Sequence, residues 1–309
     1  MILQQYICHP KEFPNLANSP NHPVIRQIKT HSGYFSKSES PEELTSYAQM
    51  QVDCLSSADI LTYGNGSIIN LINKSHAKQP NHILDDCEDS SSVGFAKTIN
   101  SLTADNPDMI FVPFDFIEAL DPFMASFDKW ASNKTILMVS PFPKTFSVQN
   151  KRRHLLFQDY KFPNFKLKVC KSPMTLNTTF SDIEGNTETS CWHDELNLML
   201  EKISAVDFDV ALLSCGSYAT PAAHFIKTKL GKKAIYMGGP ALPMFNIDSK
   251  RYRIYNTPFY KNRSLRYMLS VVEQGSYSYL KKMKKVTREL EGYDAYFTPT
   301  ESTFLFQKF

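Results

Sequence analysis

Short apolar runs alternate with stretches of helical periodicity through most of the chain. Runs of four apolar residues occur at 109–112, 136–139, 210–213 and 234–237. Such runs are typical of strands that helices bury on both faces, whereas the spacing of apolar residues across 221–230 is typical of a helix. This alternation predicts an α/β fold with a doubly wound, mostly parallel sheet and helices on both faces, in a Rossmann-like arrangement.

The segment from 206 to 240 predicts one strand, a crossover helix and a second strand. The helix is expected to start at Thr220, with the hydroxyl as its cap and Pro221 in its first turn. Parallel strands end at one edge of a sheet, where helix N-termini attract anions, so a phosphate or diphosphate is the expected ligand. The glycines also fit a simpler interpretation as tight turns, and Tyr218 fits either a nucleobase stack or the core. The candidate binding residues of this segment are Gly216, Ser217, Tyr218, Gly238 and Gly239.

A second candidate segment spans residues 134–157. It predicts a strand at 136–139, a Ser-Pro-Phe turn and a basic helix that continues through Arg153. On a helix Gln149 and Arg153 share a face, so this face is expected to point back at the strand end and to hold a diphosphate through arginine. A solvated basic face is the alternative. The candidate binding residues here are Ser140, Phe142, Lys144, Gln149, Arg152 and Arg153.

The remaining elements follow from the same signals. Residues 1–40 are rich in Pro, Asn and Ser and predict irregular structure, and Ser40 and Pro41 predict the start of a helix that reaches Ser56. A strand at 59–63 leads into a glycine-rich turn and a helix at 68–74, which repeats the logic of the other units. Further expected elements are an edge strand at 165–169, a helix at 192–203 and a helix at 264–291.

Charge separates the last part of the chain from the rest. Residues 1–256 are expected to form one α/β domain, and residues 257–309 a basic helical extension packed on the same body. Eleven Lys and Arg residues lie between Lys250 and Arg288, where Glu273 is the one acid. Tyrosines interleave with these charges, as in proteins that bind single-stranded nucleic acid. Binding of nucleic acid or another polyanion is therefore an alternative function, although such charge runs also occur as solvated helix faces.

Composition limits the remaining possibilities. The chain has 309 residues, a net charge of +3 and 42% hydrophobic residues, with no apolar run long enough to cross a bilayer and no signal-peptide pattern at its start. We therefore expect a cytoplasmic protein. The six cysteines form no C-x-x-C pair, so no zinc site is predicted. The acidic loop at 85–92 has the carboxylates for a magnesium ion but also the composition of a solvated loop, and no metal site is assigned to it.

Three stretches together resemble a family of bacterial and viral surface-polysaccharide proteins with the GT-D type of glycosyltransferase fold. The first is ILMVSPFPKTFSVQNKRRHLLF, with its Ser-Pro-Phe turn, Gln and Arg pair. The second is WHDELNLMLEKISAVDFDVALLSCGSY, similar to that family's Trp-led helix, Asp-Phe-Asp and Cys-Gly-Ala-Tyr. The third is ATPAAHFIKTKLGKKAIYMGGPALPMFNIDSKRYR, which resembles its helix, Gly-Gly and Lys-Arg-aromatic run. The matched part covers a third to a half of the chain.

The resemblance implies a transferase that moves a sugar from a nucleoside-diphosphate sugar to a glycan or another hydroxyl acceptor, which could itself be anionic. It also places the turn Gly64, Asn65, Gly66 and Ser67 where related enzymes carry Asp-Gly-Glu, whose acids hold a divalent cation. Both acids are replaced here, so metal dependence stays open, and an inactive scaffold of the same fold is a further alternative. A carboxylate is needed to take the proton of the acceptor hydroxyl. The candidate bases are Asp115, Glu118 and Glu301.

Overall fold

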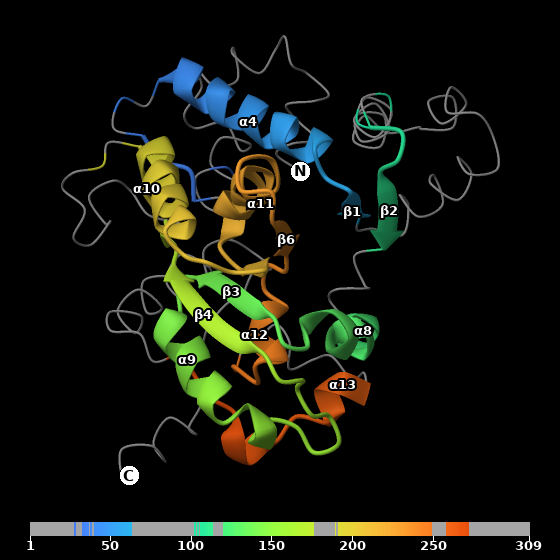
Figure 1. Ribbon diagram of the computed structural model, residues 1–309. Helices are drawn as coiled ribbons and strands as arrows, with labels where there is room; N and C mark the ends of the chain where they lie inside the picture. Colours follow the sequence, from blue (N-terminus) through green and yellow to red (C-terminus); the bar gives the residue numbers. More distant parts are fainter. Residues whose placement is uncertain are drawn as a thin grey trace, which may run out of the picture.

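A parallel four-stranded sheet forms the centre of the molecule (Figure 1). The computed structural model of the chain describes residues 28, 33–36, 38, 40–63, 102, 104, 106–113, 120–175, 189, 191–248 and 258–271. The strands of the sheet are β3 (Thr135–Ser140), β4 (Lys166–Lys171), β5 (Val210–Leu213) and β6 (Lys233–Tyr236). They lie in the order β4-β3-β5-β6, and each neighbouring pair is parallel. The predicted α/β fold with a parallel sheet is confirmed.

The strand order changes direction between β3 and β5. From β3 the chain moves to β4 on one side, whereas β5 and then β6 are added on the other side. The crossover helices are α9 (Pro143–Lys151), α10 (Trp192–Ser204) and α11 (Ala219–Thr228). Open α/β sheets bind ligands beyond the carboxyl ends of their strands at such a change of direction. The exits of β3 and β5 therefore lie where this architecture binds ligands.

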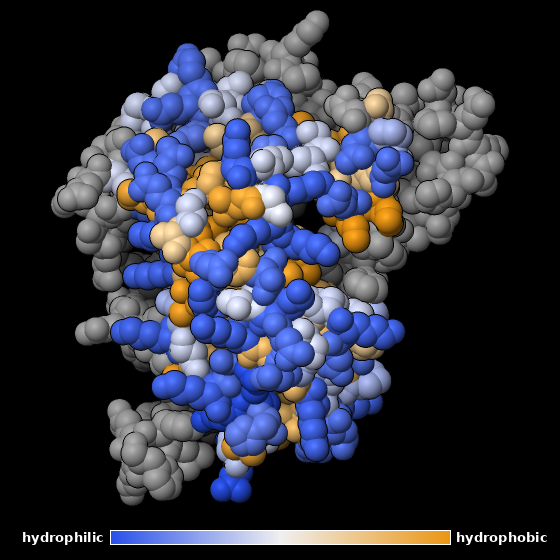
Figure 2. Space-filling model, in the orientation of Figure 1, coloured by the Kyte–Doolittle hydropathy of each residue, from blue (hydrophilic) through white to orange (hydrophobic). Residues whose placement is uncertain are grey.

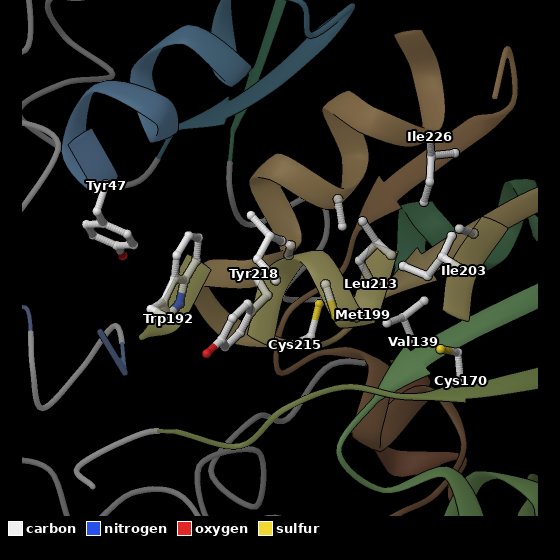
Figure 3. Close-up of a cluster of buried hydrophobic side chains, with 14 of the residues drawn as sticks. Tyr47, Val139, Cys170, Trp192, Met199, Ile203, Leu213, Cys215, Tyr218 and Ile226 are labelled. Carbon is white, nitrogen blue, oxygen red and sulfur yellow. The ribbon is translucent and has the colours of Figure 1, made fainter. Parts of the chain in front are cut away.

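Alternate side chains of the central strands enter two separate cores. Leu137 and Val139 face a core that α4 (Pro41–Ser56), α10 and α11 complete (Figure 3). Ile136 and Met138 face a second core with α8 (Asp121–Ala131), α9, α12 (Ala241–Met244) and α13 (Pro258–Lys261). All four strand residues are fully buried. This burial explains why the strand is apolar without alternation, and it confirms helices on both faces of the sheet.

Helix α4 begins as its sequence predicts. The Ser40 side chain accepts hydrogen bonds from the backbone N–H groups of Glu42 and Glu43, and Pro41 occupies the first turn. The far end of the helix is attached to α11, since the Lys227 ammonium donates to the Ser57 carbonyl (2.7 Å) and to Asp59 Oδ1 (2.6 Å). The C-terminal end of α4 is thereby fixed against the last turn of α11.

Two further strands form a separate parallel pair. They are β1 (Ile60–Tyr63) and β2 (Ile110–Pro113), which match the strands predicted at 59–63 and 109–112. Ile60 and Ile110 lie opposite each other and are each 57% exposed, and Figure 2 shows hydrophobic atoms at this position. In the described part of the chain this pair is not hydrogen-bonded to the four-stranded sheet.

Three predicted elements differ in the structure. Helix α11 does not start at Thr220: the 3-10 turn η5 (Gly216–Tyr218) leads directly into Ala219, so the Thr220 hydroxyl is not a cap. Residues 264–271 do not begin a long helix, because this segment contains only the 3-10 turn η7 (Leu265–Tyr267) before Leu269 bridges to Ile247. The helix after β3 ends at Lys151, and η3 (Arg153–Leu155) follows it.

Other predictions concern residues that the structure does not describe. The helix at 68–74, most of the segment 1–40 and the extension beyond residue 271 lie outside the described residues. The division at residue 256 stays a prediction for the same reason. None of the helices in the described part of the chain combines the length and hydropathy needed to cross a bilayer. Cys54, Cys170, Cys191 and Cys215 carry free thiols.

Candidate functional site

The carboxyl edge of the sheet brings the exits of β3, β4, β5 and β6 together. Backbone hydrogen bonds extend one residue beyond the strands on both sides of β3, from Ser172 N–H to the Ser140 carbonyl (3.1 Å) and from Ser214 N–H to the Val139 carbonyl (2.8 Å). The Gly238 N–H donates to the Leu213 carbonyl at 3.0 Å, so the exits of β5 and β6 are also joined. The carboxyl edge thus comprises the exits of these four strands and the turns that follow them.

Two of the predicted glycines lie on this edge in the left-handed region of backbone conformation. Gly216 has φ of +57° and Gly238 has φ of +59°. A Cβ atom added to Gly216 would meet nothing within 4 Å, and one added to Gly238 would lie 3.5 Å from the Tyr236 ring. The turn after β5 is therefore open on the side that a side chain would occupy, which permits a ligand to approach the backbone closely. Gly239 follows Gly238 and accepts the Leu242 N–H at 3.0 Å as the chain enters α12.

Ser217 and Tyr218 are held from outside the turn. The Trp192 indole N–H donates to Ser217 Oγ at 3.1 Å, and the Gln51 amide donates to the Ser217 carbonyl at 2.9 Å. Tyr218 is 2% exposed, and its ring stacks on Trp192 with centroids 4.7 Å apart (Figure 3). The Tyr218 ring therefore belongs to the core, which corrects its assignment as a surface for a nucleobase.

The Tyr218 hydroxyl is also engaged. The Thr175 hydroxyl donates its one hydrogen to the Gly33 carbonyl at 2.6 Å, so the Tyr218 hydroxyl is the donor in its 3.0 Å contact with Thr175 Oγ1. Burial raises the pKa of Tyr218 well above its usual value. This phenol is therefore neutral and acts as a structural hydrogen-bond donor.

The turn after β3 contributes less side-chain chemistry than predicted. Ser140 is fully buried, and its hydroxyl accepts the Phe142 N–H at 3.2 Å. Phe142 is 4% exposed and its ring packs in the second core, so its side chain is not available to a ligand. Lys144 is exposed in the first turn of α9. Because α9 starts directly after the exit of β3, Lys144 is the cation that this segment places near the carboxyl edge.

The two arginines lie away from the carboxyl edge. Helix α9 is antiparallel to β3 in a crossover unit, and its nine residues at about 1.5 Å each carry the chain about 13 Å back toward the amino edge. Arg153 donates to the Phe165 carbonyl at 2.9 Å, immediately before β4, and its guanidinium lies 4.5 Å from the Phe165 ring centroid. Arg152 Nε donates to Gln149 Oε1 at 2.7 Å. Burial lowers the pKa of both arginines. The predicted arginine contact with a diphosphate at the strand ends is therefore not what the structure shows.

Gln149 belongs to a buried polar hub, formed by Gln149, Asn246 and Arg263. The Gln149 amide donates to the carbonyls of Asn246 (2.9 Å) and Tyr267 (3.1 Å). The Asn246 amide donates to the carbonyls of Leu156 (3.1 Å) and Ser264 (2.8 Å), and Arg263 Nε donates to Asn246 Oδ1 (3.0 Å). Gln149 and Asn246 are fully buried and Arg263 is 6% exposed. The hub fixes residues 263–269 against α9, so Gln149 has a structural role instead of the predicted binding role.

The basic segment is described only in part. Within residues 258–271, Arg263 and Tyr260 are buried, and Arg266 lies 5.6 Å from the Tyr267 ring centroid. Tyr260 and Arg263 therefore pack on the body of the protein, whereas Lys261 and Arg266 are exposed, and nucleic-acid binding by this segment stays a prediction. The remaining cations of the segment lie outside the described residues.

Several predicted site residues cannot be placed. The candidate bases and the glycine-rich turn after β1 lie outside the described residues, as does the acidic loop: Asp115, Glu118, Glu301, Gly64, Asn65, Gly66, Ser67 and residues 85–92. In the described part of the chain, no group of three or more His, Cys, Asp or Glu side chains is arranged to hold a metal ion.

Sequence reasoning missed the residues that support the turn after β5. Gln51 and Thr175 are polar residues with 5% and 3% exposure. A polar residue on the apolar face of a predicted helix is a weak signal for such a role, and Gln51 lies on the same buried side of α4 as Leu44 and Tyr47. Nothing in the sequence of the loop that carries Thr175 indicates its partner.

Comparisons with protein-family models, with curated proteins and with solved structures each found no match for this chain.

Proposed function

We propose that this protein is a glycosyltransferase that binds a nucleoside-diphosphate sugar at the carboxyl edge and transfers the sugar to a hydroxyl of a glycan or another acceptor. The observation that carries the proposal is the reversal of the strand order between β3 and β5, with Gly216 open beside the exit of β5. The resemblance of three stretches to GT-D proteins supports the same activity.

The chemistry of the donor sets what the edge has to supply. Breaking the glycosidic bond leaves a nucleoside diphosphate whose negative charge must be stabilised as it develops. The helices α9 and α11 start at this edge, and helix starts favour anions through their exposed N–H groups and dipole. Lys144 adds a cation in the first turn of α9. Backbone amides and Lys144 replace Arg152 and Arg153 as the proposed diphosphate contacts.

The acceptor side of the reaction needs a base. A carboxylate that takes the proton of the acceptor hydroxyl contributes typically 10²–10⁴-fold to the rate. Asp115, which follows β2 in the chain, and Glu118 and Glu301 stay the candidates for this role. A divalent metal is not a required part of the proposal.

Ligand-induced stabilisation tests the proposal directly. Thermal unfolding should be followed with UDP, ADP, GDP, CDP and dTDP sugars, with sodium sulfate at matched ionic strength as the control for general anion effects. A ligand at 100 times its Kd stabilises the folded state by about 2.7 kcal/mol, which raises the Tm measurably. Release of nucleoside diphosphate in the presence of acceptor glycans then measures transfer. No shift with any sugar nucleotide at millimolar concentration contradicts the proposal, and salt-sensitive binding to single-stranded RNA in its place favours the polyanion alternative.

A further inference from the structure

The turn after β5 is attached at one residue to two helices that are distant in the sequence. Ser217 receives a hydrogen bond on its carbonyl from Gln51 of α4 (2.9 Å) and another on its hydroxyl from Trp192 of α10 (3.1 Å). Neither bond belongs to the regular pattern of the helix that supplies the donor. Both donors come from buried side chains, since Gln51 is 5% exposed and Trp192 is fully buried.

Aromatic packing holds the donors in place. The Trp192 ring stacks on the Tyr218 ring, with centroids 4.7 Å apart and an interplanar angle of 15°. The Tyr47 ring packs edge-on against Trp192, also with centroids 4.7 Å apart. Tyr34 packs on Tyr47 at 4.9 Å. Figure 3 shows Tyr47, Trp192 and Tyr218 in a row between α4 and the turn. The indole N–H therefore has one orientation, and it points at Ser217.

These attachments act next to the open backbone of the turn. Gly216 directly precedes Ser217, is exposed, and has open space where a Cβ would lie. The first hydrogen bond of η5 runs from the Tyr218 N–H to the Cys215 carbonyl (3.3 Å), so the Gly216 N–H lies outside the turn's own hydrogen bonds. A glycine in a short turn is otherwise free to change its φ and ψ, which would redirect this N–H.

We infer that Gln51 and Trp192 are positioning residues that fix the Gly216–Ser217 backbone in its diphosphate-binding conformation before the ligand arrives; the inference rests on the proposed function. Preorganised amides bind an anion more tightly than amides that must first be ordered, because the ordering free energy has already been supplied by folding. Neither side chain needs to contact the ligand.

Two conservative variants test the inference, with a third as control. Gln51→Met keeps the length of the side chain and removes its N–H donors, and Trp192→Phe keeps an aromatic ring against Tyr218 and removes the indole N–H. Ile203→Val changes a fully buried residue of the same core that lies at the opposite end of α10 from Trp192. It controls for a general loss of stability.

Binding of inorganic pyrophosphate, UDP, ADP, GDP and CDP is measured by calorimetry. We expect about tenfold weaker binding in Gln51→Met and in Trp192→Phe, and unchanged binding in Ile203→Val. The chain has two tryptophans, so Trp130→Phe leaves Trp192 as the one fluorescent indole. In that background, we expect the ligand to change the Trp192 emission. Unchanged affinity in both Gln51→Met and Trp192→Phe would overturn the inference.

Hydrogen exchange separates this inference from the proposed function. Exchange of the amides at 214–219 is followed by mass spectrometry without ligand. We expect faster exchange in Gln51→Met than in the wild type, and wild-type exchange in Ile203→Val. If the wild type binds none of the probes, the proposed function fails and the ligand role of the turn fails with it, whatever the exchange result. If the wild type binds and the exchange of Gln51→Met is unchanged, only the positioning inference fails.

Discussion

The two edges of the four-stranded sheet are completed in different ways. At the amino edge, side chains pair the backbone groups and charges at the strand ends. Asp209 Oδ2 accepts the Thr135 N–H (2.7 Å), and Lys232 forms an ion pair with Asp207 (3.0 Å). At the carboxyl edge, the turns after β5 and β6 carry glycines, and Lys144 is an exposed cation. Charged side chains at strand ends therefore do not by themselves indicate a binding site.

The difference also separates two motifs that lie close together in the sequence. The Asp-Phe-Asp motif, with Phe208 in the core beneath the Lys232 ammonium (4.6 Å), closes the amino edge. The Cys-Gly-Ser-Tyr motif a few residues later leaves an open glycine at the carboxyl edge. One β-strand lies between them, so their distinct roles follow from which end of β5 each one occupies.

The largest expected effect concerns the polar hub, which lies away from the carboxyl edge. Asn246→Ala removes three side-chain hydrogen bonds and leaves their buried partners, including Arg263, without them. It also places alanine at φ of +53°. We expect a loss of about 3 kcal/mol or more in the free energy of unfolding, measured with urea. Asn246→Gly removes the same bonds without the backbone strain, and it should be less destabilising by about 1 kcal/mol. A total loss below about 1 kcal/mol would contradict the structural role of the hub.

A matched pair of glycines compares the edges directly. Gly216 at the carboxyl edge and Gly231, which precedes β6 at the amino edge, have φ of +57° and +62° and open space at the Cβ position. Alanine at either position should cost about 1–2 kcal/mol of stability from the left-handed conformation. Only Gly216→Ala should also weaken binding of nucleoside diphosphates, by tenfold or more in calorimetry, since its methyl group occupies the open side of the turn. Equal affinity in the two variants would count against the carboxyl edge as the binding site.

The cations of α9 give a similar contrast within one helix and the turn that follows it. Lys144→Ala should lower the affinity for nucleoside diphosphates about tenfold, or about 1.4 kcal/mol, with stability changed by less than about 0.5 kcal/mol. Arg153→Ala should do the reverse: it loses the hydrogen bond to the Phe165 carbonyl and the contact with the ring, so we expect a loss of about 1 kcal/mol in stability and unchanged affinity. Weaker binding of nucleoside diphosphates in Arg153→Ala would instead indicate that Arg153 contacts the ligand.

The smallest expected effect is a pH dependence at the amino edge. The hydrogen bond and charge of Lys232 hold the pKa of Asp207 below its ordinary value. Because the pKa is lower in the folded state than in the unfolded state, this stabilisation is present above the unfolded value of about 4 and is lost as the pH falls through the folded value. The stability difference between wild type and Asp207→Asn should thus be small at pH 7 and smaller at pH 3. In a Lys232→Met background it should shrink to the smaller contribution of the Lys168 and Lys166 charges, and an undiminished difference there would contradict the role of Lys232.

Much of the fold could be predicted because burial on both faces leaves a direct mark in the sequence. The fully buried strand Ile136 to Val139 and the Ser40 cap were both readable from local residues. The position of strand β6 in the sheet was harder to predict. Its apolar run resembles that of a central strand, yet β6 lies at the edge of the sheet and Tyr236 is 46% exposed. An apolar run therefore indicates that a strand packs against the core, but not whether it has one or two neighbouring strands in the sheet.

The site was harder to predict because helical periodicity gives the face of a residue and not the end of the sheet that it reaches. Gln149 lies on α9 as predicted, whereas Arg153 lies in η3 beyond the end of this helix, and α9 returns toward the amino edge, where Arg153 contacts Phe165. Tyr218 is a second example, since a stacked core tyrosine and a nucleobase platform have the same sequence. Long-range partners such as Gln51 and Ser217 are set by tertiary packing alone.

The central position of β3 has a consequence for synthesis on the ribosome. Its first neighbour, β4, follows soon after it in the chain, but its second neighbour, β5, emerges much later, between α10 and α11, two of the helices that cover Leu137 and Val139. A nascent chain that ends before β5 therefore exposes an apolar strand edge and half a core. We expect such intermediates to bind chaperones and to aggregate when released early.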